Sequence, residues 1–138
     1  EAIEAHLAIA DWYQWNRRYA EAVRNYEEAW SMATGHPDEE RWLRTVLDEP
    51  LELPRDSVFN QGAIPLGTKN EAEVAMRFDV NRHGEAKGIT ILTQKNPDTR
   101  DGVTRAYHYL KNVRFRPILR EGEVVKAEDI ERSYKVRF

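Results

Sequence analysis

Histidine side chains are the groups of this 138-residue chain that most often hold metals or move protons. The four histidines are His6, His36, His83 and His108. None has a second histidine or a carboxylate at the spacing with which a helix or a hairpin holds a metal ion. We expect His83 to be a polar turn residue before Gly84 and His108 to face solvent from a helix. The sequence therefore predicts no metal site and no cofactor.

Nucleophiles and acid–base pairs are equally sparse. The chain contains no cysteine, which excludes disulfides, thiolate metal ligands and a cysteine nucleophile. Its serines lack the context of an activated nucleophile, and the glycines at 62 and 67 do not form a phosphate loop. Four acids fall in predicted turns or helix starts, where acids are common for local reasons: Asp98, Asp101, Glu121 and Glu123. We therefore predict that the protein is not an enzyme.

The second half of the chain begins with two predicted strands joined by a turn. The first strand spans residues 73–81 and alternates with a period of two, which is typical of a strand with one buried face. Gly84 is free to adopt a positive φ, so residues 81–84 predict a hairpin turn. Ile89 and Ile91 then mark the buried face of the second strand. The buried face of the first strand consists of Val74, Met76, Phe78 and Val80.

A helix and further strands follow. The Asn-Pro-Asp-Thr segment at 96–99 ends the second strand and offers helix-capping side chains. Alternation predicts a strand over residues 113–117, a turn at residues 121–123 and a half-buried last strand that carries Tyr134, Val136 and Phe138. The helix between them has one apolar stripe, formed by Val103, Ala106, Tyr107 and Leu110.

Residues 73–138 resemble the C-terminal domain of TonB, a periplasmic energy transducer. The resemblance rests on an ordered series rather than on one motif. It comprises the strand from Val74 to Val80, the turn glycine Gly84, the Ile-x-Ile-Leu strand, the helix with Ala106 facing inward and the Val-Arg-Phe-Arg-Pro segment at 113–117. It implies an α+β fold in which one helix packs on one face of a small antiparallel three-stranded sheet.

The same resemblance implies how the domain would bind. In that family the last strand lies at the sheet edge and pairs with a short extended peptide of an outer-membrane transporter. An unpaired edge offers a row of backbone donors and acceptors, so an incoming strand gains main-chain hydrogen bonds. The expected partner-binding residues of the last strand are Arg132, Ser133, Tyr134, Lys135, Val136 and Arg137.

One segment departs from the family pattern. TonB-like domains carry a Tyr-Pro dipeptide and a short helix just before the first strand, and that region helps to hold the peptide. Here residues 57–67 contain a proline but no Tyr-Pro, and two glycines disfavour a helix. Recognition of the usual transporter peptide is therefore open.

Residues 3–34 resemble one tetratricopeptide repeat, which implies a helical hairpin. Alanines 10, 22 and 29 would lie where the two helices touch closely, and tyrosines 13, 19 and 26 would fill the gap between them. Gly35 is suited to end the second helix. A third helix is predicted from Pro37, with acids in its first turn, to the stop at Pro50. A lone repeat buries its faces poorly, so we expect these helices to dock on the sheet domain or to belong to a longer chain.

Trp12 and Trp15 fall at no position of this repeat that must be buried. One interpretation is an exposed aromatic platform for a partner peptide, since tryptophan is enriched at binding hot spots. The other is that both pack on the third helix or on a neighbouring repeat.

The predicted organisation is a helical segment at 1–49, a linker at 50–69 that is rich in proline and glycine, and the sheet domain at 70–138. Residues 1–57 carry a net charge of −7 and residues 58–138 one of +4. The basic half could face an acidic partner, an anionic envelope surface or its own acidic helices; the simpler interpretation is two solvated surfaces. The domain is only mildly basic and lacks a nucleic-acid-binding motif, so we expect no nucleic-acid partner.

Two functions remain open at this point. The first is a TonB-like module of the periplasm that captures an extended peptide, with the full-length protein anchored to the inner membrane. No run of apolar residues approaches the roughly 20 needed to cross a bilayer, so such an anchor would be missing from this chain. The second is a periplasmic scaffold whose repeat helices bind a partner protein without energy transduction. An edge strand can also pair with its own copy, so a homodimer is a further possibility.

Overall fold

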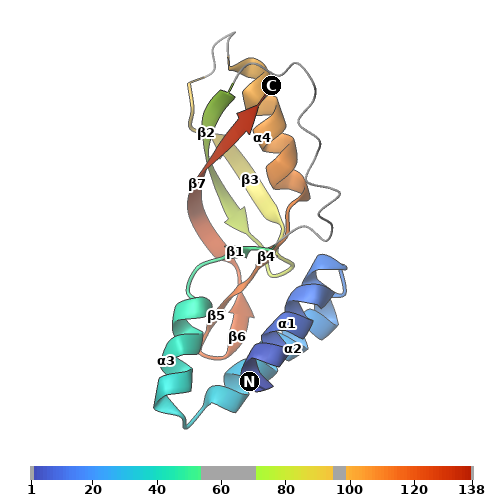
Figure 1. Cartoon of the computed structure of the whole chain (residues 1–138), viewed down its shortest axis with the longest axis vertical. Helices are drawn as coiled ribbons and strands as arrows, with labels where there is room; N and C mark the ends of the chain where they lie inside the picture. Colours follow the sequence, from blue (N-terminus) through green and yellow to red (C-terminus); the bar gives the residue numbers. More distant parts are fainter. Residues whose placement is uncertain (1, 54–70, 95–98, 138) are drawn as a thin grey trace.

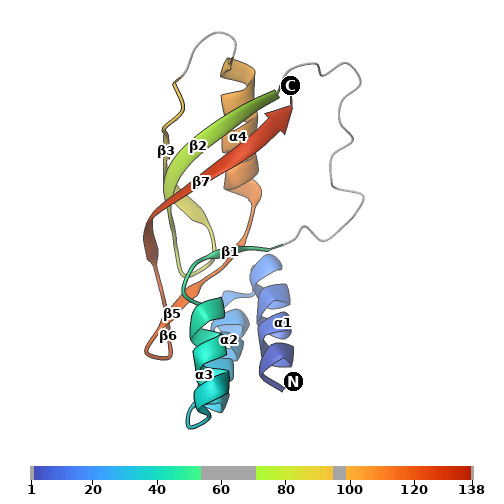
Figure 2. The same cartoon turned by 60° about the vertical axis from the view of Figure 1, so that its left-hand side comes forward.

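The computed structural model describes residues 2–53, 71–94 and 99–137. Three helices form one end of the molecule, and a sheet with a fourth helix forms the other (Figure 1). The chain crosses between the two ends more than once, because a small hairpin that follows the fourth helix returns to the helical end (Figure 2). Among the described residues, no helix is long and apolar enough to cross a membrane.

The helical end contains α1 (Ala2–Trp15), α2 (Tyr19–Ala33) and α3 (Pro37–Val46). The predicted hairpin and third helix are therefore present, although the relation to tetratricopeptide repeats stays a prediction. Three fully buried alanines let α1 and α2 approach closely: Ala10, Ala22 and Ala29. Tyr26 is fully buried between them, while Tyr13 and Tyr19 are half-buried. Gly35 takes a φ of 87° after α2, as expected of a glycine that ends a helix.

The sheet end contains β2 (Glu71–Val80), β3 (Ala86–Ile91) and β7 (Ala127–Arg137), antiparallel in the order β3-β2-β7. Helix α4 (Arg100–Asn112) covers one face of this sheet (Figure 1). The alternation predicted for the first strand is confirmed, because Val74, Met76, Phe78 and Val80 are all buried. The result is an α+β fold with a three-stranded antiparallel sheet and a helix on one face.

The predicted strand over residues 113–117 lies outside this sheet, whose third strand is β7. Val113 is the C-cap residue of α4, which ends at Asn112. Only Phe115 and Arg116 form a strand, β4, which pairs with β1 (Leu51–Glu52). β1 falls inside the predicted linker, whose residues 54–69, with the departing segment 57–67, lie outside the described residues. The two-residue strands form because each supplies the other's hydrogen bonds.

The predicted turn at residues 121–123 is confirmed and joins β5 (Ile118–Arg120) to β6 (Glu123–Val125). The predicted helix cap is confirmed in part: Thr99 is the N-cap residue of α4 but makes no side-chain capping bond. Its hydroxyl instead donates to the carbonyl of Gln94 at 3.4 Å. The remaining cap residues at 96–98, and Phe138, lie outside the described residues.

Two apolar cores support the molecule. One lies between the sheet and α4. The other lies among α1, α2 and α3, and it is completed by Leu119 and Val124 of the β5–β6 hairpin. The hairpin therefore contributes core side chains to the helical end, which joins the two halves of the sequence.

Candidate functional site

The last strand is an edge strand over its full length. β7 is paired with β2 from Ala127 to Arg137, and no other described strand lies beside it. Its exposure alternates as predicted, with Arg132, Tyr134 and Val136 half-buried and Ser133 and Lys135 exposed. The expected binding residues are thus brought together on one strand.

The backbone of Ala75 shows which β7 residues face the open edge. The Ala75 amide donates to the Thr93 hydroxyl at 2.6 Å, and the Ala75 carbonyl accepts from the Leu92 amide at 2.9 Å. Both groups therefore point away from β7. Ser133 is the register partner of Ala75 on β7. It consequently directs its own N–H and C=O to the open edge, because paired residues of an antiparallel ladder are bonded or unbonded together.

Alternation extends this result along β7. Glu131, Ser133 and Lys135 direct their backbone groups outward, whereas Arg132, Tyr134 and Val136 bond to β2. The outward set also exposes its side chains on the face that α4 leaves uncovered. On that face Glu131 forms an ion pair with Arg77 at 2.9 Å. The side chain of Arg137 lies outside the described set.

The inward set is held by β1 and α4. Tyr134 donates a hydrogen bond to Glu52 at 3.3 Å, and Tyr109 of α4 donates to the same carboxylate. Arg132 donates to the carbonyl of Pro50 at 3.0 Å. Burial and the nearby charge of Glu52 raise the pKa of the Tyr134 phenol above its ordinary value of 10.0. Arg132 and Tyr134 therefore fix the strand in place. The partner-binding role expected of both residues stays a prediction.

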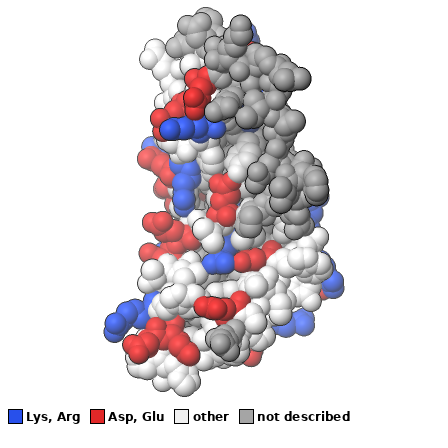
Figure 3. All heavy atoms as spheres, in the orientation of Figure 1, with Lys and Arg blue, Asp and Glu red and all other residues white. Residues whose placement is uncertain are grey.

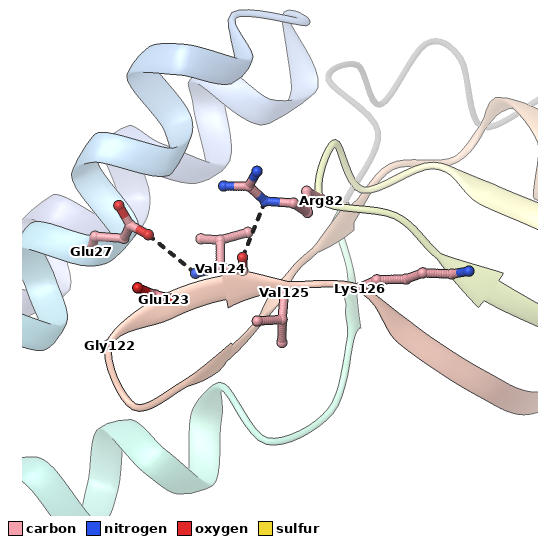
Figure 4. A pocket seen from close by; sticks show the side chains of 7 residues that line it. All are labelled: Glu27, Arg82, Gly122, Glu123, Val124, Val125 and Lys126. Carbon is pink, nitrogen blue, oxygen red and sulfur yellow. Dashed lines mark hydrogen bonds between the residues drawn. The ribbon is translucent and has the colours of Figure 1, made fainter.

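The edge of β6, in contrast, is occupied by side chains. Glu27 of α2 accepts a hydrogen bond from the Val124 amide at 3.2 Å, and Arg82 of the β2–β3 turn donates to the Val124 carbonyl at 3.1 Å (Figure 4). Lys126 continues the wall of a shallow polar cavity of about 550 Å³ around these groups. Capping of this kind protects an edge from pairing with other chains. Val124 is thus unavailable to an incoming strand.

A partly buried ion pair joins the two ends of the molecule. The guanidinium of Arg116 in β4 bonds to both carboxylate oxygens of Asp11 in α1, at 3.0 and 2.7 Å. Tyr26 donates to the same carboxylate at 2.6 Å. Burial alone would lower the pKa of Arg116, but the hydrogen bond and charge of Asp11 outweigh it and raise that pKa. Burial, with the charge of Asp11, raises the pKa of Tyr26.

The remaining predicted residues lie elsewhere. Trp12 and Trp15 are on α1 at the helical end, away from β7 (Figure 1). Trp12 is 54% exposed and Trp15 is half-buried. His108 faces solvent, and His83 lies exposed in its turn with its ring 4.2 Å from that of Tyr19. The described residues hold no group of three or more potential metal ligands.

Comparisons with protein-family models, with curated proteins and with solved structures found no match.

Sequence reasoning missed the Asp11–Tyr26–Arg116 cluster and the side chains that cap β6. Asp11 stands on a helix of which the other described side chains are mostly apolar, and Arg116 alternates with buried residues. The available signal was that Asp11 and Arg116 are each a charged residue among mostly apolar neighbours, which indicates that each needs a partner of opposite charge. The positions are 105 residues apart, so no local spacing connects them.

Proposed function

We propose that this protein is a non-enzymatic interaction module that binds an extended peptide as an added strand along β7. The observation that carries this proposal is the orientation of Ser133 and Lys135, whose backbone groups face the open edge. An incoming strand gains two hydrogen bonds for every second residue of β7. The edge is preformed, because Tyr134 bonds to Glu52 of β1 and Arg132 bonds to Pro50 just before β1.

The TonB-like order of the sequence suggests the biological setting. The partner would be a short extended segment of an outer-membrane transporter. The function of this binding would be energy transduction across the periplasm. The full-length protein would then be anchored to the inner membrane. The three-stranded sheet with a single covering helix agrees with this setting.

Proline substitution tests strand addition directly. Lys135→Pro removes an outward amide donor and leaves the bonds to β2 intact, so we expect a folded protein that has lost peptide binding. Lys135→Ala is the matched control: it removes the side chain, keeps the amide and should bind nearly as well as the wild type. Isothermal titration with transporter-derived peptides measures both. Full binding by folded Lys135→Pro would contradict the proposal.

Val136→Pro provides the opposite control. Val136 bonds to β2, so a proline there removes a ladder hydrogen bond and should unfold the last strand. If Val136→Pro stays folded and binds peptide normally, the edge-strand mechanism is wrong.

A scaffold function is the second candidate, and the exposed indole of Trp12 favours it. In that case the helical end binds a partner protein and β7 only completes the sheet. Trp12→Ala would then abolish partner binding, whereas Lys135→Pro would not.

A further inference from the structure

Helix α1 has two apolar faces, of which only one is covered. Its inner face packs on α2 and on the hairpin core through Ile3, Leu7 and Ala10. On the opposite side of the helix, every described position from residue 2 to residue 12 is apolar and exposed. This outer face consists of Ala2, Ala5, Ala8, Ile9 and Trp12.

Solvent exposure does not account for this composition. A surface helix normally carries polar residues opposite its buried stripe, and a helix that is apolar all round is normally buried. High helix propensity explains the alanines, but it does not explain Ile9 and Trp12, which are 45% and 54% exposed. Figure 3 shows a largely uncharged surface along the path that α1 follows in Figure 1.

We propose that the outer face of α1 packs antiparallel against α1 of a second copy of the chain. The side chains of this face are small near the beginning of α1, where they are alanines, and large near its end, where they are Ile9 and Trp12. A two-fold axis between Ala8 and Ile9 therefore places Trp12 of each copy over Ala5 of the other. The same axis places Ile9 over Ala8. Large side chains meet small ones throughout, as a self-complementary two-fold interface requires.

The ends of the helix favour the same direction. Glu4 is exposed near the beginning of α1, and Arg17 is exposed just beyond its end. Antiparallel packing brings the acidic end of one copy toward the basic end of the other and opposes the two helix dipoles. A parallel pair would instead place like charges side by side.

The length of α1 limits the area of the contact. The 14 residues of α1 span about 21 Å, so this interface lies at the low end of specific interfaces. We expect a dimer that dissociates on dilution. The face lies at the helical end, whereas β7 lies at the sheet end, so dimerisation leaves the edge strand free (Figure 1).

Sedimentation equilibrium of the whole chain, at concentrations up to roughly 100 µM, tests the proposal. We expect a monomer–dimer equilibrium that Trp12→Ala weakens about tenfold or more. Trp42→Ala is the matched control, because Trp42 is 42% exposed but lies on α3; it should leave the equilibrium unchanged. Lys135→Pro, which blocks the open edge of β7 but keeps the bonds to β2, should also leave it unchanged, and this separates the α1 contact from strand pairing at β7. A monomer throughout, or an equal effect of Trp42→Ala, would overturn the proposal.

A swap of the paired residues tests the register. Ala5→Trp combined with Trp12→Ala exchanges the large and small partners across the two-fold axis and should restore the dimer that Trp12→Ala loses. Circular dichroism establishes that each variant is folded. A folded swap variant that remains monomeric would overturn the antiparallel pairing and point to a helix of another protein as the occupant.

Discussion

Arg116 and Asp11 are joined by two hydrogen bonds of 3.0 and 2.7 Å, which connect strand β4 to helix α1. We call this contact between the sheet end and the helical end of the molecule the junction. Their side chains are only 13% and 21% exposed. Removal of one partner would leave the other charge largely shielded from water and without its counter-charge. The junction therefore depends on both residues together.

Asp11→Ala should lower the free energy of unfolding by about 3 kcal/mol, because Arg116 then loses its counter-charge in a buried position. Asp11→Ala combined with Arg116→Met should cost less, since no buried charge remains. Asp48→Ala breaks an ion pair with Arg120 in which both side chains are more than half exposed, and it should cost less than about 1 kcal/mol. Urea unfolding compares the three variants. Equal losses for Asp11→Ala and Asp48→Ala would contradict this description of the junction.

Alkaline pH should weaken the same junction through Tyr26. The pKa of its phenol is raised by folding, so above its ordinary value of 10.0 the unfolded chain releases its proton first. The stability that Tyr26 contributes through this shift is fully present below pH 10. It is lost as the pH rises toward the pKa that the phenol has in the folded protein. Tyr26→Phe should lower the free energy of unfolding by about 2 kcal/mol at neutral pH. Above pH 10 the stability of this variant should fall less steeply than that of the wild type. Identical alkaline slopes for the two proteins would refute the assignment.

Gly84→Ala should destabilise the contact between the β2–β3 turn and the junction. Gly84 has a φ of 75°, and its amide lies within the turn closed by Asn81. A Cβ atom there would clash with the carbonyl oxygen of Phe115 and lie 2.6 Å from Gln14 Nε2. We expect a loss of about 3 kcal/mol in thermal or urea unfolding.

Gly35→Ala is the control for backbone strain alone. Gly35 also has a positive φ, of 87°, but no atom lies within 4 Å of the added Cβ. Its cost should be only about 1 kcal/mol. Comparable decreases in the free energy of unfolding for the two variants would show that the close contacts around Gly84 do not contribute to the cost of its substitution.

Glu27→Ala should uncover the edge of β6. The Val124 amide would lose a hydrogen bond to a charged acceptor, at a cost of about 2 kcal/mol. Amide hydrogen exchange at Val124 should become faster in this variant and stay unchanged in Glu28→Ala, whose side chain is exposed on the same helix. Unaltered exchange at Val124 in Glu27→Ala would exclude the capping role.

Local patterns predicted much of the fold. The alternation from Val74 to Val80, the glycine turn at Gly84 and the apolar stripe of α4 correspond to elements in the structure, because each is set by neighbours along the chain. The half-buried last strand was predicted for the same reason. It begins at Ala127, well before the residues whose alternation predicted it, since its pairing with β2 rather than its own alternation decides where it starts.

Long-range pairs could not be predicted in this way. β1 exists only because Leu51 and Glu52 pair with residues more than sixty positions later. The contacts of Arg116 with Asp11 and of Val124 with Glu27 likewise join distant segments. The alternation of Tyr134 and Val136 showed which side chains face α4, but the outward orientation of the Ser133 and Lys135 backbone required the bonds of Ala75.

Amide hydrogen exchange along β7, measured by NMR with and without transporter-derived peptides, tests strand addition most directly. We expect an alternating result, in which the Ser133 and Lys135 amides gain protection on binding. The Tyr134 and Val136 amides, already bonded to β2, change little. Binding without new protection at Ser133 and Lys135, or protection centred on α1 around Trp12, would contradict it.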